Sequence, residues 1–337
     1  MKLALLVSPS HNRVYAQAAS ALARAELGAV SESALGGVVT DIAERTLGSV
    51  PFVTFTLPEL TEPVRAWLSN LAATFALFRL DDDERLAPLE LTRWDELDSD
   101  LVTIQKYTGK TNEVFTKLLF NVTLAASAFA AAKRPLSVLD PLAGRGTTLN
   151  QALLYGCHAS GVEIDKKDFE AYALFIQRWL KDKRLKHQAV QGSVKGHPKL
   201  DAELGVTKER FKAGDTLRLT YVNADTHAIG QLWGPRSFDL IVTDAPYGVL
   251  HGAESGAATA RKPLELLKTA IPVWRAALRP GGALGISWNT LVLRRAALAE
   301  ILAGSGLDVC DTPAYRAFEH RVDSSIQRDL LVARARP

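Results

Sequence analysis

The sequence of 337 residues contains only two cysteines, Cys157 and Cys310. Two cysteines are too few for a disulfide framework or a thiolate metal site, and we expect no bound metal. The sequence also lacks an apolar run long enough to cross a bilayer. Residues 1–13 begin with a short apolar stretch, but no small-residue cleavage site follows it, so they predict a first β-strand rather than a signal peptide. We therefore expect a cytoplasmic protein that binds no membrane.

The charges are distributed unevenly along the chain. Hydrophobic residues make up 47% and charged residues 23% of the sequence, a composition typical of a globular protein with one large domain or two of ordinary size. Residues 1–100 carry 8 Lys and Arg against 15 Asp and Glu, a net charge of −7, which leaves +10 for the rest of a chain whose net charge is +3. The C-terminal part is therefore the one suited to a polyanion, although an ordinary solvated surface can carry the same charges.

Residues 1–100 predict a small acidic α/β module. Residues 2–8, 51–57 and 75–80 read as strands, and residues 13–27 and 62–73 as helices. The acidic segment 94–100 predicts a linker to the C-terminal part of the chain.

Residues 101–337 predict a second α/β domain in which strands and helices alternate. After a helix over 113–132, we expect strands at 137–139, 159–164, 217–223, 238–243 and 283–288, and a closing hairpin of 314–320 and 329–333. Helices are expected between them at 149–155, 167–179, 263–278 and 293–304. Alternation of this kind indicates a mostly parallel sheet, whose ligands bind at the carboxyl ends of the strands.

A loop with two glycines, Asp140–Thr148, follows the first of these strands and opens a helix. Gly144 and Gly146 allow close approach of a ligand, and the helix N-terminus offers amide donors. A dinucleotide fingerprint needs a third glycine where Leu149 stands, and the lysine of a P-loop is absent. A loop for S-adenosylmethionine remains open, as does a purely structural strand–turn–helix.

Carboxylates follow the next two strands. Glu163 lies 23 residues after Asp140 and suits the two hydroxyls of a ribose, and Asp165 follows it at the end of the strand. Asp225 can accept a hydrogen bond from an adenine amino group, but an aspartate after a strand is also an ordinary turn residue. These positions favour a nucleoside cofactor.

The segment Asp244-Ala245-Pro246-Tyr247 ends a buried strand and precedes a Gly-rich loop. Methylation of a base amino group needs such residues, because the nitrogen lone pair is conjugated into the ring. Asp244 and a carbonyl of the Ala245–Pro246 turn can accept the two N–H bonds and orient that lone pair. Pro246 stiffens the turn, and Tyr247 can stack on the base. Catalysis would then come mainly from orientation and electrostatics.

These motifs resemble the class I S-adenosylmethionine-dependent amino-methyltransferases, whose signature is Asp/Asn-Pro-Pro-Tyr/Phe. Together with the loop Asp140, Pro141, Gly144, Gly146 and Thr147, their order is most similar to the catalytic domain of THUMP-type tRNA guanine-N2 methyltransferases. Over residues 105–335 the resemblance implies a Rossmann-like sheet of seven strands, mostly parallel with the last antiparallel, and cofactor contacts from that loop. Two features depart from the family: Ala245 replaces its first proline, and residues 1–100 form no complete THUMP domain.

The resemblance implies methyl transfer from S-adenosylmethionine to an exocyclic amino nitrogen, with guanosine N2 in RNA, especially tRNA, as the first expectation. A DNA adenine-N6 or cytosine-N4 methyltransferase shares the motif and is the alternative. A non-catalytic nucleic-acid-binding protein on the same fold and a nicotinamide-dependent enzyme are further alternatives. The segment Lys181–Lys212 has nine Lys or Arg against four acids and either contacts phosphates or forms a solvated helix end and loop. We expect a monomer or homodimer.

Overall fold

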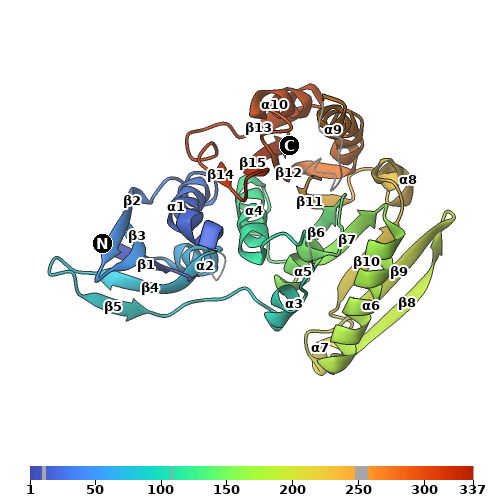
Figure 1. The fold of residues 1–337 in the computed structure, drawn as a ribbon. Helices are drawn as coiled ribbons and strands as arrows, with labels where there is room; N and C mark the ends of the chain where they lie inside the picture. The colour runs from blue at the N-terminus through green and yellow to red at the C-terminus, as the bar shows by residue number, and fades with distance from the viewer. Residues whose placement is uncertain (10–12, 108, 247–256, 337) are drawn as a thin grey trace.

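The computed structural model describes residues 1–9, 13–107, 109–246 and 257–336, which form two β-sheets with helices packed against them (Figure 1). The first sheet has five antiparallel strands in the order β2-β3-β1-β4-β5. Its elements are β1 (Lys2–Val7), α1 (Arg13–Ala34), β2 (Thr40–Leu47), β3 (Val50–Thr56), α2 (Glu62–Asn70), β4 (Thr74–Leu80) and β5 (Leu86–Leu89). The first six follow the β-α-β-β-α-β order of a ferredoxin-like unit.

The second sheet contains the strands that the sequence predicts for the larger unit. These are β6 (Ser137–Asp140), β7 (His158–Glu163), β10 (Leu217–Asn223), β11 (Phe238–Asp244), β12 (Leu278–Asn289) and β15 (Gln327–Ala335). The sheet also contains β13 (Leu307–Val309), which the sequence does not predict. Their spatial order is β10-β7-β6-β11-β12-β15-β13, and the last strand, β15, is antiparallel to both of its neighbours. The strands from β10 to β12 are parallel. The sheet is thus mixed, with five parallel strands at its centre.

The expected count of seven strands was wrong, because this sheet has ten strands within the described residues. The hairpin β8 (His187–Val194) and β9 (His197–Leu204) extends it beyond β10, within the basic segment Lys181–Lys212. Its two-residue turn, Lys195-Gly196, has positive φ at both positions, as a type I′ turn requires. The tenth strand is β14 (His320–Arg321), which pairs with β15. The strand expected over 314–320 was wrong, because only its last residue lies in β14.

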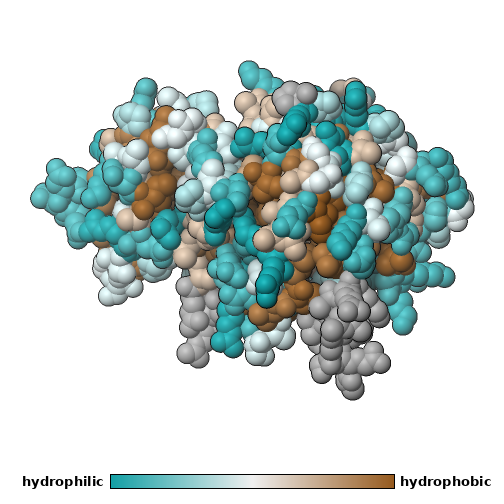
Figure 2. All heavy atoms as spheres, turned by 90° about the horizontal axis from the view of Figure 1, so that it is seen from above, coloured by the Kyte–Doolittle hydropathy of each residue, from teal (hydrophilic) through white to brown (hydrophobic). Residues whose placement is uncertain are grey.

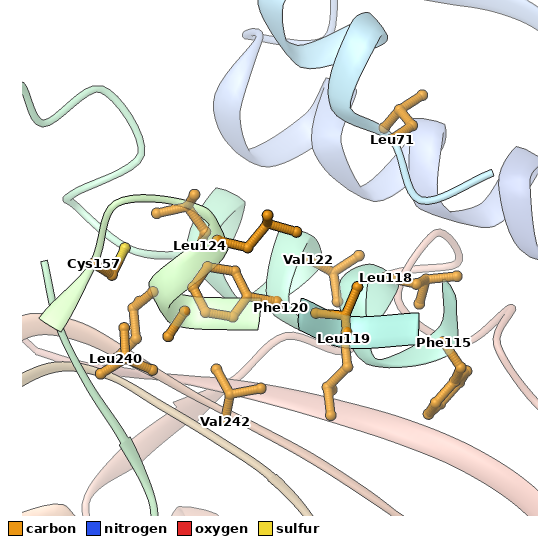
Figure 3. Close-up of a cluster of buried hydrophobic side chains, with 14 of the residues drawn as sticks. Leu71, Phe115, Leu118, Leu119, Phe120, Val122, Leu124, Cys157, Leu240 and Val242 are labelled. Atoms are coloured by element: carbon orange, nitrogen blue, oxygen red, sulfur yellow. The ribbon is translucent and has the colours of Figure 1, made fainter. Parts of the chain in front are cut away.

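Helices cover both faces of the second sheet. They are α3 (Asp100–Thr103), α4 (Glu113–Ala126), α5 (Thr147–Leu154), α6 (Lys166–Asp182), α7 (Lys208–Lys212), α8 (Ile229–Leu232), α9 (Ala257–Ala277) and α10 (Arg295–Gly304), with a short 3-10 turn η1 (Thr226–Ala228). On one face, α4, α5 and α6 share an apolar core with Leu240 and Val242 of β11. On the other, α8, α9 and α10 pack on Ile241 and Phe238. Figure 3 shows α4 between Leu240 and Val242 on one side and Leu71 on the other.

The two sheets are joined through a buried polar cluster where α1 meets α4. Glu26 is fully buried and accepts hydrogen bonds from the Ala72 amide at 2.9 Å and from Asn121 Nδ2 at 2.7 Å. Asn121 Nδ2 also donates to the Asn70 carbonyl, and Tyr155 donates its hydroxyl to Asn121 Oδ1. Burial raises the pKa of Glu26 to about 7. One apolar core therefore continues from α1 into α4 with a carboxyl group at its centre.

The acidic linker is held by the basic segment that the sequence singles out. Lys183 lies 2.6 Å from Asp98 and 2.5 Å from Asp100, and Arg210 lies 2.5 Å from Glu96. Opposite charges thus meet within the chain, so part of the charge asymmetry stabilises the junction of the two units.

Figure 2 shows hydrophilic residues around the periphery of one face, with apolar residues gathered toward its middle. Across the described ranges, no helix combines the length and apolar character needed to span a membrane.

Candidate active site

The two glycines of the loop after β6 have different surroundings. Gly146 has φ of 76°, and a Cβ built there would lie 2.3 Å from the ring of Tyr172 on α6. Gly144 has φ of 49°, but a Cβ there would meet no atom within 4 Å. Gly146 therefore allows the loop to pack on α6, whereas Gly144 keeps space open in front of the loop.

Asp140 lies at the end of β6 with only 3% of its surface exposed. Its Oδ1 accepts hydrogen bonds from the Thr243 hydroxyl at 2.8 Å and from the Leu142 amide at 3.1 Å. Burial raises the pKa of Asp140 to about 7, although these bonds oppose the shift. The carboxyl group thus connects the loop to β11, the strand that carries Asp244.

Glu163, at the end of β7, connects two adjoining loops. Its carboxylate accepts from the Gly144 amide at 2.8 Å and from the Asp165 amide at 2.7 Å. Burial raises the pKa of Glu163, and its predicted contact with a ribose stays a prediction from the sequence.

Asp165 and Asp225 have local structural partners. Asp165 caps α6 by accepting from the amides of Lys167 and Asp168. Asp225 caps η1 and accepts from the His227 amide, and its carboxylate also lies 2.5 Å from the ring nitrogen Nδ1 of His227. Burial acts to raise the pKa of Asp225, but the interactions with His227 outweigh it and hold this pKa below its usual range. The cofactor roles of both aspartates stay predictions from the sequence.

A cavity of about 380 Å³ joins the glycine loop to the Asp244 motif. Its size is within the range of small-molecule sites. Six residues predicted for the site line it: Asp140, Gly144, Thr147, Asp244, Ala245 and Pro246. Five other predicted site residues lie within the described ranges but do not line the cavity: Pro141, Gly146, Glu163, Asp165 and Asp225. Tyr247 lies outside the described residues.

The segment before α4 contributes lining residues that the motifs do not reveal. The Tyr107 hydroxyl lies 3.2 Å from Thr147 Oγ1, and its ring is 4.8 Å from the Arg145 guanidinium. Arg145 donates to Asp168 at 2.7 Å, which places two more charged groups at the cavity. In the sequence, only the position of Tyr107 ahead of β6, the first strand of the larger unit, indicated that it could reach the cofactor site. Phe115 is fully buried, as expected for a core residue.

Asp244 is surrounded by hydroxyl groups. Its Oδ2 accepts from Thr111 Oγ1 at 2.5 Å, and its Oδ1 accepts from the Ser287 hydroxyl on β12. The guanidinium of Arg328 on β15 lies 3.9 Å from Oδ2. The carboxylate is therefore held between three parts of the chain and remains partly exposed to the cavity, at 19% of the side chain.

Ala245 has a structural reason to differ from proline. Its amide donates to the Ser287 carbonyl at 2.8 Å, and its buried side chain belongs to the apolar cluster on the α9 and α10 face of the sheet. A proline has no N–H and would lose this hydrogen bond. The motif is thus anchored to β12 by the residue that breaks the family pattern.

Within the parts of the chain that the structure covers, no group of three or more His, Cys, Asp or Glu side chains is arranged to hold a metal ion.

Comparison with known proteins gives only loose likenesses. No protein-family model and no curated protein matches the chain. Among solved structures, the 1,6-didemethyltoxoflavin-N1-methyltransferase of Burkholderia thailandensis, with S-adenosylhomocysteine bound, is 19% identical over 62% of this chain and 75% of its own, with a TM-score of 0.35. A TehB-like SAM-dependent methyltransferase from Corynebacterium glutamicum is 15% identical, over 62% and 84%, with a TM-score of 0.35.

A SAM-dependent methyltransferase from Methanosarcina mazei is 12% identical, over 61% of this chain and 95% of its own, with a TM-score of 0.38. At such scores the likeness assigns no activity to this chain. The strand order and the cavity described above are properties of the chain itself.

Proposed function

We propose that the protein transfers a methyl group from S-adenosylmethionine to an exocyclic amino nitrogen of a nucleobase. The observation that carries this proposal is the cavity that brings Gly144 and Asp140 together with Asp244 and Pro246. Methyl transfer requires the methyl group of the cofactor and the amino group of the substrate to lie close together, and one cavity that contains both motifs allows this.

The residues at the cavity fit this cofactor. Gly144 leaves open space where a side chain would stand, and Thr147 begins a helix whose N-terminal amides point along its axis toward this end. Asp140 and Asp168 place carboxyl groups around the same cavity, which suits a positively charged sulfonium. Glu163, fixed by the Gly144 amide, would hold the ribose hydroxyls.

When bound, S-adenosylmethionine supplies an electrophilic methyl carbon on a cationic sulfur. Asp244 would accept one N–H of the amino group, and a carbonyl of the Ala245–Pro246 turn the other, so that the nitrogen lone pair faces the cofactor. Transfer of the methyl group from sulfur to the nitrogen would leave a neutral thioether, and Asp244, which accepts one N–H of the amino group, would take the proton that the nitrogen then releases. Tyr247 would stack on the base.

For the substrate we propose guanosine N2 in RNA, with tRNA as the first candidate. Six cations of the basic segment form no ion pair within the described residues: Lys181, Arg184, Lys186, Lys195, Lys208 and Lys212. Lys195 donates to the Gln231 carbonyl, and the other five are available to phosphates. The target base must be unpaired or flipped to reach a cavity of this size.

The proposal is tested by incubating the protein with methyl-labelled cofactor and either total RNA or DNA, followed by nucleoside mass spectrometry. We expect N2-methylguanosine from RNA. Asp244→Ala should lower turnover by at least about a thousandfold and change cofactor affinity by no more than about threefold. Methylated adenine or cytosine in DNA would identify the alternative substrate. Absence of cofactor binding by calorimetry would favour a non-catalytic nucleic-acid-binding protein and refute the enzyme.

A further inference from the structure

A buried arginine lies behind the proposed acceptor site. The Arg328 side chain on β15 is 6% exposed, and its Nη2 lies 3.9 Å from Asp244 Oδ2. Removing a guanidinium from water is costly unless nearby groups compensate its charge. The chain places this cation where it balances the carboxylate that would orient the substrate.

The strand register places these groups on one face of the sheet. Asp244 pairs with Ser287 across β11 and β12, and Arg328 pairs with Asn289 across β15 and β12. Residues directly opposite one another, and residues two apart on one strand, share a face of the sheet. Asp244, Ser287 and Arg328 therefore form a polar row beneath α4, and the Ser287 hydroxyl bonds directly to Asp244.

Aromatic packing fixes the position of the guanidinium. Its central carbon lies 4.7 Å from the ring centroid of Phe115, which is fully buried in the first turn of α4. The His320 ring lies 5.2 Å from the same phenylalanine. A cation on an aromatic face is stabilised electrostatically, so Phe115 holds Arg328 beside Asp244 instead of allowing it to reach solvent.

We infer that Arg328 is a positioning residue for the proposed methyl transfer: it balances the charge of Asp244 and fixes its carboxylate as an acceptor. An unbalanced carboxylate would attract ammonium groups, whereas one paired with a guanidinium beside a cationic cofactor suits a neutral amino group. This inference rests on the proposed function, and its first test needs no substrate.

The first test is a double-mutant cycle of thermal stability with Arg328→Gln, Asp244→Asn and the double variant. Arg328→Gln should lower Tm by about 3–6 °C in the wild-type background, because it removes the cation beside the Asp244 carboxylate. In the Asp244→Asn background the same substitution should lower Tm by less than about half of that amount, since the carboxylate charge is already gone. Additive shifts, equal within about 1 °C, would show that the two side chains are not coupled and would overturn the inference. This result stands whether or not a nucleic acid is methylated.

The second test separates kcat from KM on the methylated substrate. Arg328→Gln should lower kcat by about ten- to a hundredfold, with KM and cofactor affinity within about twofold, and Arg328→Lys should recover part of the loss. Arg295→Gln is the matched control, because Arg295 pairs with Asp329, the neighbour of Arg328 on the opposite face of β15. Equal losses in the two glutamine variants, or no loss in Arg328→Gln, would contradict a positioning role. If the wild-type protein methylates neither RNA nor DNA, the proposed function fails. The double-mutant cycle of Tm values then decides by itself whether Arg328 and Asp244 are coupled.

Discussion

Gly144 and Gly146 are two residues apart in one loop, yet they lack a side chain for different reasons. An alanine at position 146 would place its Cβ against Tyr172 and in a left-handed backbone, so Gly146→Ala should destabilise the fold by about 3 kcal/mol. An alanine at position 144 has room and bears only the backbone strain, about 1 kcal/mol, but its methyl group would enter the cavity.

We therefore expect Gly144→Ala to weaken cofactor binding by about tenfold or more, with a loss of stability of only about 1 kcal/mol. Gly146→Ala should lose about 3 kcal/mol of stability, while its folded molecules bind the cofactor nearly as well as the wild type. Chemical denaturation and calorimetry on both variants measure the two effects. An equal loss of stability in both variants would contradict the prediction that only a Cβ at position 146 collides with Tyr172.

Asp140 predicts a pH dependence of cofactor binding. Burial raises the pKa of Asp140 to about 7, so the free protein holds a proton there below that pH. A cationic ligand favours the ionised carboxylate, and binding should therefore release a proton. Affinity should rise with pH, by up to about tenfold per unit, until about pH 7, and then level off.

Calorimetry at several pH values, in buffers of different ionisation enthalpy, measures both the affinity and the proton released. Asp140→Asn, which keeps an oxygen for Thr243 and Leu142, is the control and should flatten the dependence. An affinity of the wild-type protein that does not change between about pH 6 and 8 would refute the linkage.

The sequence predicts the cavity residues that belong to a local motif. It does not predict the residues that distant strands bring to the same cavity. Asp140, Gly144 and Asp244 follow buried strands or end them, and parallel strands bring their carboxyl ends to one edge. Ser287 and Arg328 approach Asp244 only through the pairing of β11, β12 and β15, which no local pattern encodes.

At the level of elements, the sequence predicts the strands that are continuously apolar and buried, but it does not predict the strands that are mostly exposed. The expected strands at 217–223 and 238–243 match β10 and β11, because both are largely buried. Strands β2 and β8 are mostly exposed, so their apolar residues do not alternate clearly enough to be recognised. Of the strand expected over 314–320, only His320 lies in a strand, β14. Tyr315 and Phe318 are indeed buried, but they lie in a turn and in the loop after it.

The β8–β9 hairpin depends on its turn. Gly196 has φ of 84°, where a β-branched residue is strained, so Gly196→Val should destabilise the hairpin by about 1–2 kcal/mol. The strain is confined to the sheet edge beyond β10, so hydrogen exchange should accelerate in β8 and β9 while β6 and β11 stay protected. Lys195→Ser is a milder control. Uniform acceleration across the whole sheet would show that the hairpin is not a separate unit.

At the scale of the whole molecule, Glu26 links stability to pH. Its pKa is raised by burial from 4.5 to about 7, so the folded protein binds this proton more tightly than the unfolded chain. The stabilisation is complete below about pH 4.5 and is lost as the pH rises through about 7. Glu26→Gln does not titrate and should therefore be more stable than the wild type at pH 8, by on the order of 2 kcal/mol, and nearly equal at pH 5.

Urea denaturation of both proteins at the two pH values measures this difference. Glu32→Gln, on the same helix, is a control expected to change little. A glutamine variant of Glu26 that is less stable at pH 8 would show that Asn121 and Ala72 require the charged form.

Helix α4 is covered on two sides: β11, β12 and β15 lie against one side and α1 against the other. A gene fragment that begins near residue 100 would expose the apolar side that α1 covers, and with it the environment of Phe115, which holds Arg328. The change of charge near residue 100 is thus not a place to divide the protein. The N-terminal unit covers one apolar side of α4, and we therefore expect the two units to fold correctly only when they are expressed as one chain.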